Sequence, residues 1–409
     1  MSTMSCGSDP DSQFLGEIGR QIGGETGPAP QPEPTMPRSL SVAADSPDPV
    51  GELARELGPD PFALIVLFVS LEAALGPLLD RMAQRFPGTQ IVGCTTAGEI
   101  NATGYASGQI VALAFPAAGF VAAPVLFEDI DQLDTRRTIA KVLDARQALS
   151  AHVTSHPHDA AILLVDGLSG QEEALVAALS SGLGQVQMIG GSAGDAGEFR
   201  NASVFSGRRV LQNAAILCLL RSKGEMRDFS LDHTRASAAR MIVTAADPAS
   251  RAALRINDEP AAQEYARLIG LPVEALSSHV FATHPVLVRA GGRYHARAIR
   301  HVGAGNALVF FSAVAEGMVL TVSEPGDMAA HLKTELGRLS QPRAPALILG
   351  FDCIFRRIDA EGRQQATEVS RLLARHRVIG FSTYGEQYGG LHVNQTLTGI
   401  AFYPPEQTG

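Results

Sequence analysis

The sequence predicts an α/β fold made of repeated strand–helix–strand units that form mixed sheets, with an inserted antiparallel hairpin region. Three observations support this. Fully apolar runs of strand length alternate with segments that have helical periodicity. A glycine-containing turn of one chemical form closes three such units, and short strand-like runs separated by glycine-rich turns fill residues 279–322. Apolar strands that alternate with helices are typical of mixed or parallel sheets covered on both faces.

The repeated turn is the most informative pattern in the chain. Each copy runs from an apolar strand through a glycine into small hydroxyl residues, then to a second glycine and a carboxylate. The copies occupy 91–99, 188–195 and 378–386 and end in Glu99, Asp195 and Glu386. Loops repeated in this way suggest an internally duplicated architecture in which the three loops converge on one site. Their carboxylates either hold a cationic group of a ligand or accept backbone N–H bonds that fix the turns.

Each turn belongs to a unit of similar order. The first unit has strands at 62–69 and from 91, a helix over 71–86 and a later strand at 109–115. The second has strands at 160–165 and 214–220 and a helix over 172–183, and the third has strands at 345–349 and 397–402 and a helix near 360–375. Residues 1–50 are rich in Pro, Ser, Gly and Asp, and we expect them to be disordered. The folded part divides into a first domain over 51–225 and a second over 240–404.

Composition excludes several classes of partner. The net charge is −9 with 33 Lys plus Arg, and no basic run occurs, so we expect no nucleic-acid binding. No apolar stretch approaches the roughly 18 residues of a membrane helix. Because the chain shows no signal peptide and its four cysteines are scattered, we expect a cytoplasmic protein with reduced thiols.

The second turn matches the G-x-S-x-G pattern of a hydrolase nucleophile elbow. Ser192 would then be the nucleophile, with Asp352 and His392 as later partners in the expected order. Two features argue against this. The residues after Ser192 are a poor helix start, and the repeats place Thr96 and Thr383 where Ser192 stands. We therefore expect no enzyme and keep the serine hydrolase as an alternative.

Histidines are the other candidate ligands. His152, His156 and His158 stand beside Asp159, but they form a polar connector for which an exposed loop is the better interpretation. His284 is flanked by apolar residues, where a neutral imidazole is either a core residue or an axial ligand. Four arginines follow it in one hairpin: Arg289, Arg293, Arg297 and Arg300. They either form a solvated strand face or pair with a carboxylate or a haem propionate.

Several separated motifs carry a family resemblance. Residues 92–100 and 190–195 resemble the N-terminal FIST domain, and 351–354, 380–386 and 392–396 resemble the C-terminal FIST domain. The resemblance covers about residues 50 to 404. It implies an intracellular sensory module that binds a small ligand, with amino acids as proposed ligands. In that haem-free version, the ligand-binding residues would be Glu99, Asp195, Glu386 and Asn394.

One branch of the family consists of haem-binding, nitric-oxide-sensing proteins that regulate a separate histidine kinase or cyclic-di-GMP enzyme. The resemblance to this branch implies haem b, with His284 as the first choice for the iron ligand and His295 or His301 as alternatives. Arg297 would be a further cofactor-binding residue. Three phenylalanines would pack on the porphyrin: Phe281, Phe310 and Phe311. A haem-based nitric oxide sensor acting in trans is thus the leading expectation, with the haem-free sensor as its alternative.

Overall fold

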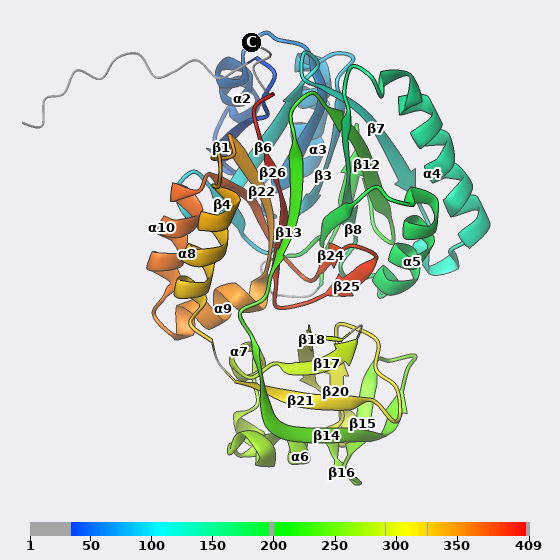
Figure 1. Ribbon diagram of the computed structural model, residues 1–409, viewed down its shortest axis with the longest axis vertical. Coiled ribbons are helices and arrows are strands. Elements are labelled where there is room, and N and C mark those ends of the chain that lie inside the picture. Colours follow the sequence, from blue (N-terminus) through cyan, green and yellow to red (C-terminus); the bar gives the residue numbers. More distant parts are fainter. Residues whose placement is uncertain (1–33, 196–199, 291, 325, 406–409) are drawn as a thin grey trace, which may run out of the picture. The chain divides into compact units, whose positions relative to one another are not determined.

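The structure is a computed structural model that describes residues 34–195, 200–290, 292–324 and 326–405 (Figure 1). The predicted α/β fold is confirmed. Three six-stranded sheets each combine parallel and antiparallel pairs, and an eight-stranded sheet is antiparallel. Within the described part of the chain, no helix has the length and apolarity needed to span a membrane.

The chain contains three copies of one structural repeat. The first repeat comprises β1 (Arg38–Ala43), α2 (Pro49–Leu57), β2 (Phe62–Val69), α3 (Leu75–Arg85), β3 (Gln90–Thr95), the hairpin β4 (Glu99–Asn101) and β5 (Gly104–Ala106), and β6 (Gln109–Pro116). The second comprises β7 (Phe120–Phe127), α4 (Thr135–Leu149), β8 (His158–Val165), α5 (Glu172–Leu183), β9 (Met188–Ser192), the hairpin β10 (Val204–Ser206) and β11 (Arg209–Leu211), and β12 (Ala215–Ser222). The third comprises β13 (Met226–Leu231), α8 (Met328–Leu339), β22 (Leu347–Cys353), α9 (Ile354–Gly362), α10 (Ala366–Arg375), β23 (Val378–Thr383), the hairpin β24 (Glu386–Tyr388) and β25 (Leu391–Val393), and β26 (Leu397–Phe402).

The repeats exchange their hairpins in a closed cycle. The first sheet has the order β1-β6-β2-β3-β10-β11, so its last two strands come from the second repeat. The second sheet, β25-β24-β9-β8-β12-β7, takes its hairpin from the third repeat, and the third sheet, β13-β26-β22-β23-β4-β5, takes its hairpin from the first. Because every repeat gives one hairpin and receives another, the three sheets depend on one another for their edge strands.

The central strands are continuous apolar runs because the side chains on both faces of each of them are buried. Along β2, Leu64, Val66 and Phe68 join a core cluster shared by the three sheets. The intervening Ile65 and Leu67 belong to a cluster with α2 and α3. The Phe68 ring lies 4.8 Å from that of Phe381 on the third sheet. The expectation that the sheets are covered on both faces is therefore confirmed, with helices on one face and the other sheets on the second.

A further sheet interrupts the third repeat between β13 and α8, and we call residues 235–324 the inserted sheet. It contains β14 (Arg235–Asp247), β15 (Ala252–Ile256), β16 (Glu259–Pro260), α6 (Ala261–Ile269), α7 (Ser278–Thr283), β17 (Val286–Ala290), β18 (Arg293–Arg297), β19 (Ile299–Val302), β20 (Leu308–Phe310) and β21 (Val319–Glu324). The predicted antiparallel hairpin region is thus present. The insertion splits the third repeat, so β13 pairs with β26 from the far end of the chain.

Some expected boundaries need correction. Strand β1 lies inside the segment 1–50 that we expected to be disordered, because it pairs with β6 along six residues and buries Val42. Residues 1–33 of that segment lie outside the described residues. The single helix expected near 360–375 is two helices, α9 and α10, and the helix expected over 71–86 starts later, at Leu75.

Candidate functional site

The three glycine turns meet one another. Each turn donates one backbone hydrogen bond to a neighbouring turn, so the three bonds close a ring. They run from Ala97 N to Ser382 O, from Tyr384 N to Ser192 O and from Gly194 N to Thr95 O, each at 3.1 Å. The sequence repeat therefore corresponds to a structural one, and the loops converge as the pattern predicts.

The ring also corrects the alignment of the turns. Thr95 N, Ser192 N and Ser382 N each bond a carbonyl of the hairpin received from another repeat. Ser192 is therefore equivalent to Thr95 and Ser382, and our placement of Thr96 and Thr383 at its position is wrong by one residue. The error arises because the second turn is one residue shorter and ends in Asp195 without an equivalent glutamate.

Glu99 and Glu386 have matching hydrogen bonds. Glu99 Oε1 accepts from Thr96 Oγ1, and its Oε2 accepts from Gln109 N at 3.1 Å. Glu386 Oε1 accepts from Thr383 Oγ1, and its Oε2 accepts from Thr396 N at 3.2 Å and Oγ1 at 2.8 Å. Both carboxyls are buried, and burial raises the pKa of each, to about 8 for Glu386. These contacts fit the turn-fixing interpretation.

Asp195 is bonded differently. Its Oδ1 accepts from the Tyr384 hydroxyl, and its Oδ2 accepts from the backbone N–H groups of Arg200 and Asn201, both at 2.6 Å. The carboxylate is buried. Asp195 therefore joins its own loop to the third turn and does not repeat the role of Glu99. A ligand-binding role for Glu99, Asp195 and Glu386 remains a prediction.

The residues of the hydrolase alternative are not arranged as a triad. Ser192 Oγ accepts a hydrogen bond from Gln387 Nε2 at 3.0 Å, and the same nitrogen lies 3.4 Å from His392 Nδ1. Gln387 thus occupies the place where a base would contact the nucleophile. Asp352 instead accepts from Arg356 Nε at 2.6 Å and from the Tyr105 hydroxyl.

The histidines expected to bind haem lie on separate elements. His284 follows α7, and its Nδ1 lies 2.9 Å from Thr283 Oγ1. His295 lies on β18 and His301, which is exposed, on β19. On β18, Arg297 has its Nη1 3.9 Å from Glu173 Oε1. Among the described residues, no group of three or more His, Cys, Asp or Glu side chains is arranged to hold a metal ion, including the group around His156.

The phenylalanines expected to pack on a porphyrin pack on protein rings. The Phe281 ring lies 6.0 Å from that of Tyr265, and the Phe311 ring lies 5.7 Å from Phe355. Phe310 is also buried in this cluster of the inserted sheet. These rings therefore already have partners within the protein, and haem binding at His284 remains a prediction.

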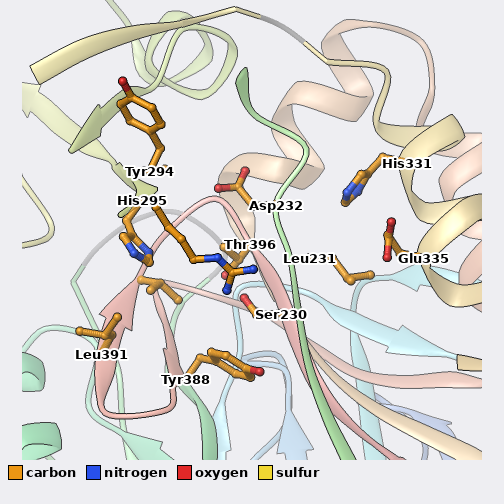
Figure 2. A pocket seen from close by; sticks show the side chains of 13 residues that line it. Ser230, Leu231, Asp232, Tyr294, His295, His331, Glu335, Tyr388, Leu391 and Thr396 are labelled. Carbon is orange, nitrogen blue, oxygen red and sulfur yellow. The ribbon is translucent and has the colours of Figure 1, made fainter. Parts of the chain in front are cut away.

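A cavity lies between the inserted sheet and the third repeat (Figure 2). Its volume is about 370 Å3, within the range of small-molecule sites. The lining residues come from the end of β13, from β18, from α8, from the β24–β25 hairpin and from the connection to β26: Ser230, Leu231, Asp232, Arg293, Tyr294, His295, Ala296, His331, Glu335, Tyr388, Leu391, Val393 and Thr396. We call it the β18–α8 cavity.

Groups of both charge signs face this cavity. Figure 2 shows His295 and Leu391 on one side, His331 and Glu335 on the other, and Asp232 between them. Burial lowers the pKa of His331, and the Arg356 charge lowers it further. The buried Nδ1 of His331 has no hydrogen-bond partner. Arg293 supplies the guanidinium. The arrangement suits a ligand that carries an anionic and a cationic group.

A smaller cavity of about 300 Å3 adjoins the first turn. Glu99 lines it together with Arg357 from α9, whose Nη1 donates to Ala106 O at 2.9 Å and whose Nη2 donates to Ser107 Oγ at 3.0 Å. Arg357 therefore holds the end of the β4–β5 hairpin against α9.

Arg293 and His295 were candidates from the sequence, whereas Asp232, His331 and Glu335 were not. The last two stand four residues apart on α8, a spacing that places both on one helix face. That spacing was the available signal. Asp232 follows β13 directly and carried no distinguishing pattern.

The fold and the cavity define a ligand-binding α/β module with an inserted sheet. Family models identify it further: the FIST N domain matches residues 63–259 and the FIST C domain matches residues 261–389. The chain belongs to the FIST family, whose domains are generally sensory domains of signal-transduction proteins. The boundary between the two models falls inside the inserted sheet. No curated protein sequence matches the chain significantly.

Proposed function

We propose that this protein is a sensor that binds a zwitterionic small molecule of the amino-acid class in the β18–α8 cavity. The observation that carries the proposal is that Arg293 and two carboxylates, Asp232 and Glu335, line one cavity of about 370 Å3. Arg293 would pair with the ligand carboxylate, and Asp232 and Glu335 with its ammonium group. The cavity joins the inserted sheet to the third repeat, so a bound ligand contacts both.

Direct binding tests the proposal. Each of the common amino acids is titrated into the purified protein, with calorimetry and the thermal midpoint of unfolding as readouts. We expect saturable binding of at least one amino acid and a higher midpoint, because a ligand that binds only the folded state stabilises it. Asp232→Asn and Arg293→Gln should each weaken binding by about tenfold or more, since each removes a charge-assisted hydrogen bond.

Arg289→Gln is the matched control. Arg289 is an exposed arginine on the neighbouring strand β17 and does not line the cavity, so its loss changes the net charge equally. Binding should be unchanged in this variant. The proposal fails if no amino acid binds, or if Asp232→Asn binds as tightly as the unsubstituted protein.

The output of the sensor is proposed to act on a separate enzyme, a histidine kinase or a cyclic-di-GMP enzyme. The family assignment supports a signalling role of this general kind. The test adds the purified protein, with and without its amino acid, to candidate enzymes from the same source and measures their turnover. A change that requires the ligand and is lost in Asp232→Asn supports the proposal, and unchanged turnover of every candidate contradicts it.

A haem-bound form that senses nitric oxide remains a prediction, and the contacts of His284 and of the three phenylalanines do not favour it. Reconstitution with haemin tests it by absorption spectroscopy. A Soret band that disappears in His284→Ala would support the haem form. Its absence in the reconstituted protein would exclude haem and leave the amino-acid proposal untouched.

A further inference from the structure

Each repeat contains a parallel pair of strands whose carboxyl ends lie at one of the three turns. The pairs are β2 with β3, β8 with β9 and β22 with β23. In α/β sheets, ligands bind in the crevice beside the carboxyl ends of the strands. The three repeats therefore offer three equivalent positions for a ligand, and what covers each position decides whether it is open.

The inserted sheet covers the position in the second repeat. Arg251, which directly precedes β15, donates from Nη2 to Gly170 O at 2.6 Å and to Glu173 Oε2 at 2.7 Å. Ala313 N donates to the other oxygen of Glu173 at 2.7 Å. The connection from β8 to α5 is thus bonded to two segments of the insertion.

The inserted sheet also covers the position in the third repeat. The ring of Phe311 lies 5.7 Å from that of Phe355 at the start of α9 and 6.3 Å from that of Tyr384, which follows β23. All three rings are buried. Gln395 Nε2 donates to Ala282 O in α7 at 3.3 Å. Aromatic packing and this hydrogen bond therefore close the crevice.

The position in the first repeat is open. It is the cavity of about 300 Å3 beside the first turn, and we call it the first-repeat cavity. The described residues that line it come from the β2–α3 connection, the first turn, the β5–β6 connection and α9, and none of them belongs to the inserted sheet. Its apolar lining is supplied by Leu71, Ala97, Ile354 and Ile358. Leu71 is 45% exposed, so the chain of a ligand would find apolar surface to cover.

Two carboxylates of the lining lie against residues 108–109. Glu99 Oε2 accepts from Gln109 N, and Glu72 Oε2 lies 2.9 Å from the point that a Cβ on Gly108 would occupy. Burial raises the pKa of Glu99, and the Glu72 charge raises it further. Glu72 forms no ion pair with any residue that the structure describes. A cation between the two carboxylates would relieve their repulsion.

The guanidinium of Arg357 does not supply that cation. Its Nε donates to Glu361 Oε1 at 3.1 Å, and both Nη atoms donate to the end of the β4–β5 hairpin. The lining thus holds three carboxylates and one guanidinium, an excess of negative charge. Because no group of described side chains here is arranged to hold a metal ion, an organic cation fits the cavity better.

We propose that the first-repeat cavity binds a primary amine that carries a short hydrocarbon chain. The ammonium group would donate to Glu72 and Glu99, since each oxygen of Glu99 accepts one bond from the protein and has capacity for another. The chain would cover Leu71, Ile354 and Ile358 and remove apolar surface from water. The site is separate from the β18–α8 cavity and does not depend on the proposed amino-acid function.

The n-pentylammonium ion is the probe that tests the site. Calorimetry follows its binding to the purified protein at pH 7, with two controls: 1-pentanol has the chain without the charge, and ammonium chloride has the charge without the chain. We expect saturable binding of pentylammonium that is at least about tenfold tighter than that of either control. NMR locates the bound probe through nuclear Overhauser contacts between its chain and the methyl groups of Ile354 and Ile358.

Glu72→Gln should weaken pentylammonium binding by about tenfold or more, because it removes a charged acceptor from an exposed residue that the fold does not need. Leu71→Ser should weaken it in the same direction. Glu56→Gln is the matched control, since Glu56 is exposed on α2, loses the same charge and does not line the cavity. Binding should be unchanged in this variant.

Reciprocal variants separate the two cavities. Asp232→Asn should leave the pentylammonium response intact, and Glu72→Gln should leave amino-acid binding intact. The proposal is overturned if 1-pentanol binds as tightly as pentylammonium, or if Glu72→Gln binds pentylammonium as the unsubstituted protein does. Saturable binding without contacts from the chain to Ile354 or Ile358 would also overturn it.

Discussion

The first and third turns have the same local chemistry and different surroundings. In both, a threonine hydroxyl three residues earlier bonds one oxygen of the glutamate, and a backbone N–H ten residues later bonds the other. Glu99 lines a cavity beside the Arg357 guanidinium, whose charge lowers the pKa of Glu99, whereas Glu386 is fully buried and the Asp352 charge raises its pKa. The repeated sequence thus determines the hydrogen bonds, and what covers each turn determines the ionisation of its carboxyl group.

The largest expected effect is on the pH dependence of stability. The Glu386 carboxyl loses its proton near pH 4.5 in the unfolded chain and near pH 8 in the folded one. Between these values the folded state binds more protons, so Glu386 lowers the free energy of unfolding as pH rises. Glu386→Gln removes this contribution. The variant should gain stability over the unsubstituted protein by about 1.4 kcal/mol per pH unit in that window, or on the order of 3 kcal/mol by pH 7.

Urea unfolding at several pH values measures this difference, and Glu99→Gln is the matched variant in the first turn. Burial also raises the pKa of Glu99, while the Arg357 charge lowers it. The difference in the free energy of unfolding between Glu99→Gln and the unsubstituted protein, plotted against pH, should therefore rise in the same direction with a shallower slope. We call such a plot the difference curve of the variant. Equal slopes for the two variants would show that the surroundings of the turns do not matter. A flat curve for Glu386→Gln would mean that Glu386 is ionised when folded.

The second largest expected effect is the loss of stability when either turn glycine is replaced by alanine, which has a steric cause in one turn and a backbone cause in the other. Gly385 and Gly98 each precede the glutamate of their turn, but a Cβ on Gly385 would overlap the buried His392 ring, whereas Gly98 has a φ of +124°. Gly385→Ala and Gly98→Ala should each destabilise the protein by about 1–3 kcal/mol, the first by overpacking and the second by backbone strain.

Double variants distinguish the two causes through their free energies of unfolding. His392→Ala removes the ring that the new Cβ would meet, so Gly385→Ala should cost much less in that background. Arg357→Ala should not relieve Gly98→Ala, because strain in φ stays after the side chain is removed. Additive effects at Gly385 and His392 would contradict the steric explanation.

The sequence predicted the repeats but not the way they combine. Gly93, Gly190 and Gly380 could be recognised as equivalent because each follows an apolar strand. The exchange of hairpins could not be predicted, since a short pair such as β24 and β25 carries no local signal for which sheet it joins. The cavity could not be predicted either, because Asp232 and His331 belong to the third repeat and Arg293 to the insertion, and the sequence does not show that the insertion packs against that repeat.

The smallest expected effect tests whether Arg357 accounts for the difference between the turns. Arg357→Met removes the hydrogen bonds to Ala106 O and Ser107 Oγ, which should cost about 1 kcal/mol and increase hydrogen exchange in the β4–β5 hairpin. It also removes the cation that favours the charged form of Glu99, so the pKa of Glu99 should rise further. In this background the Glu99→Gln difference curve should become steeper and approach that of Glu386→Gln. An unchanged slope would show that burial alone, and not the guanidinium, governs the ionisation of Glu99.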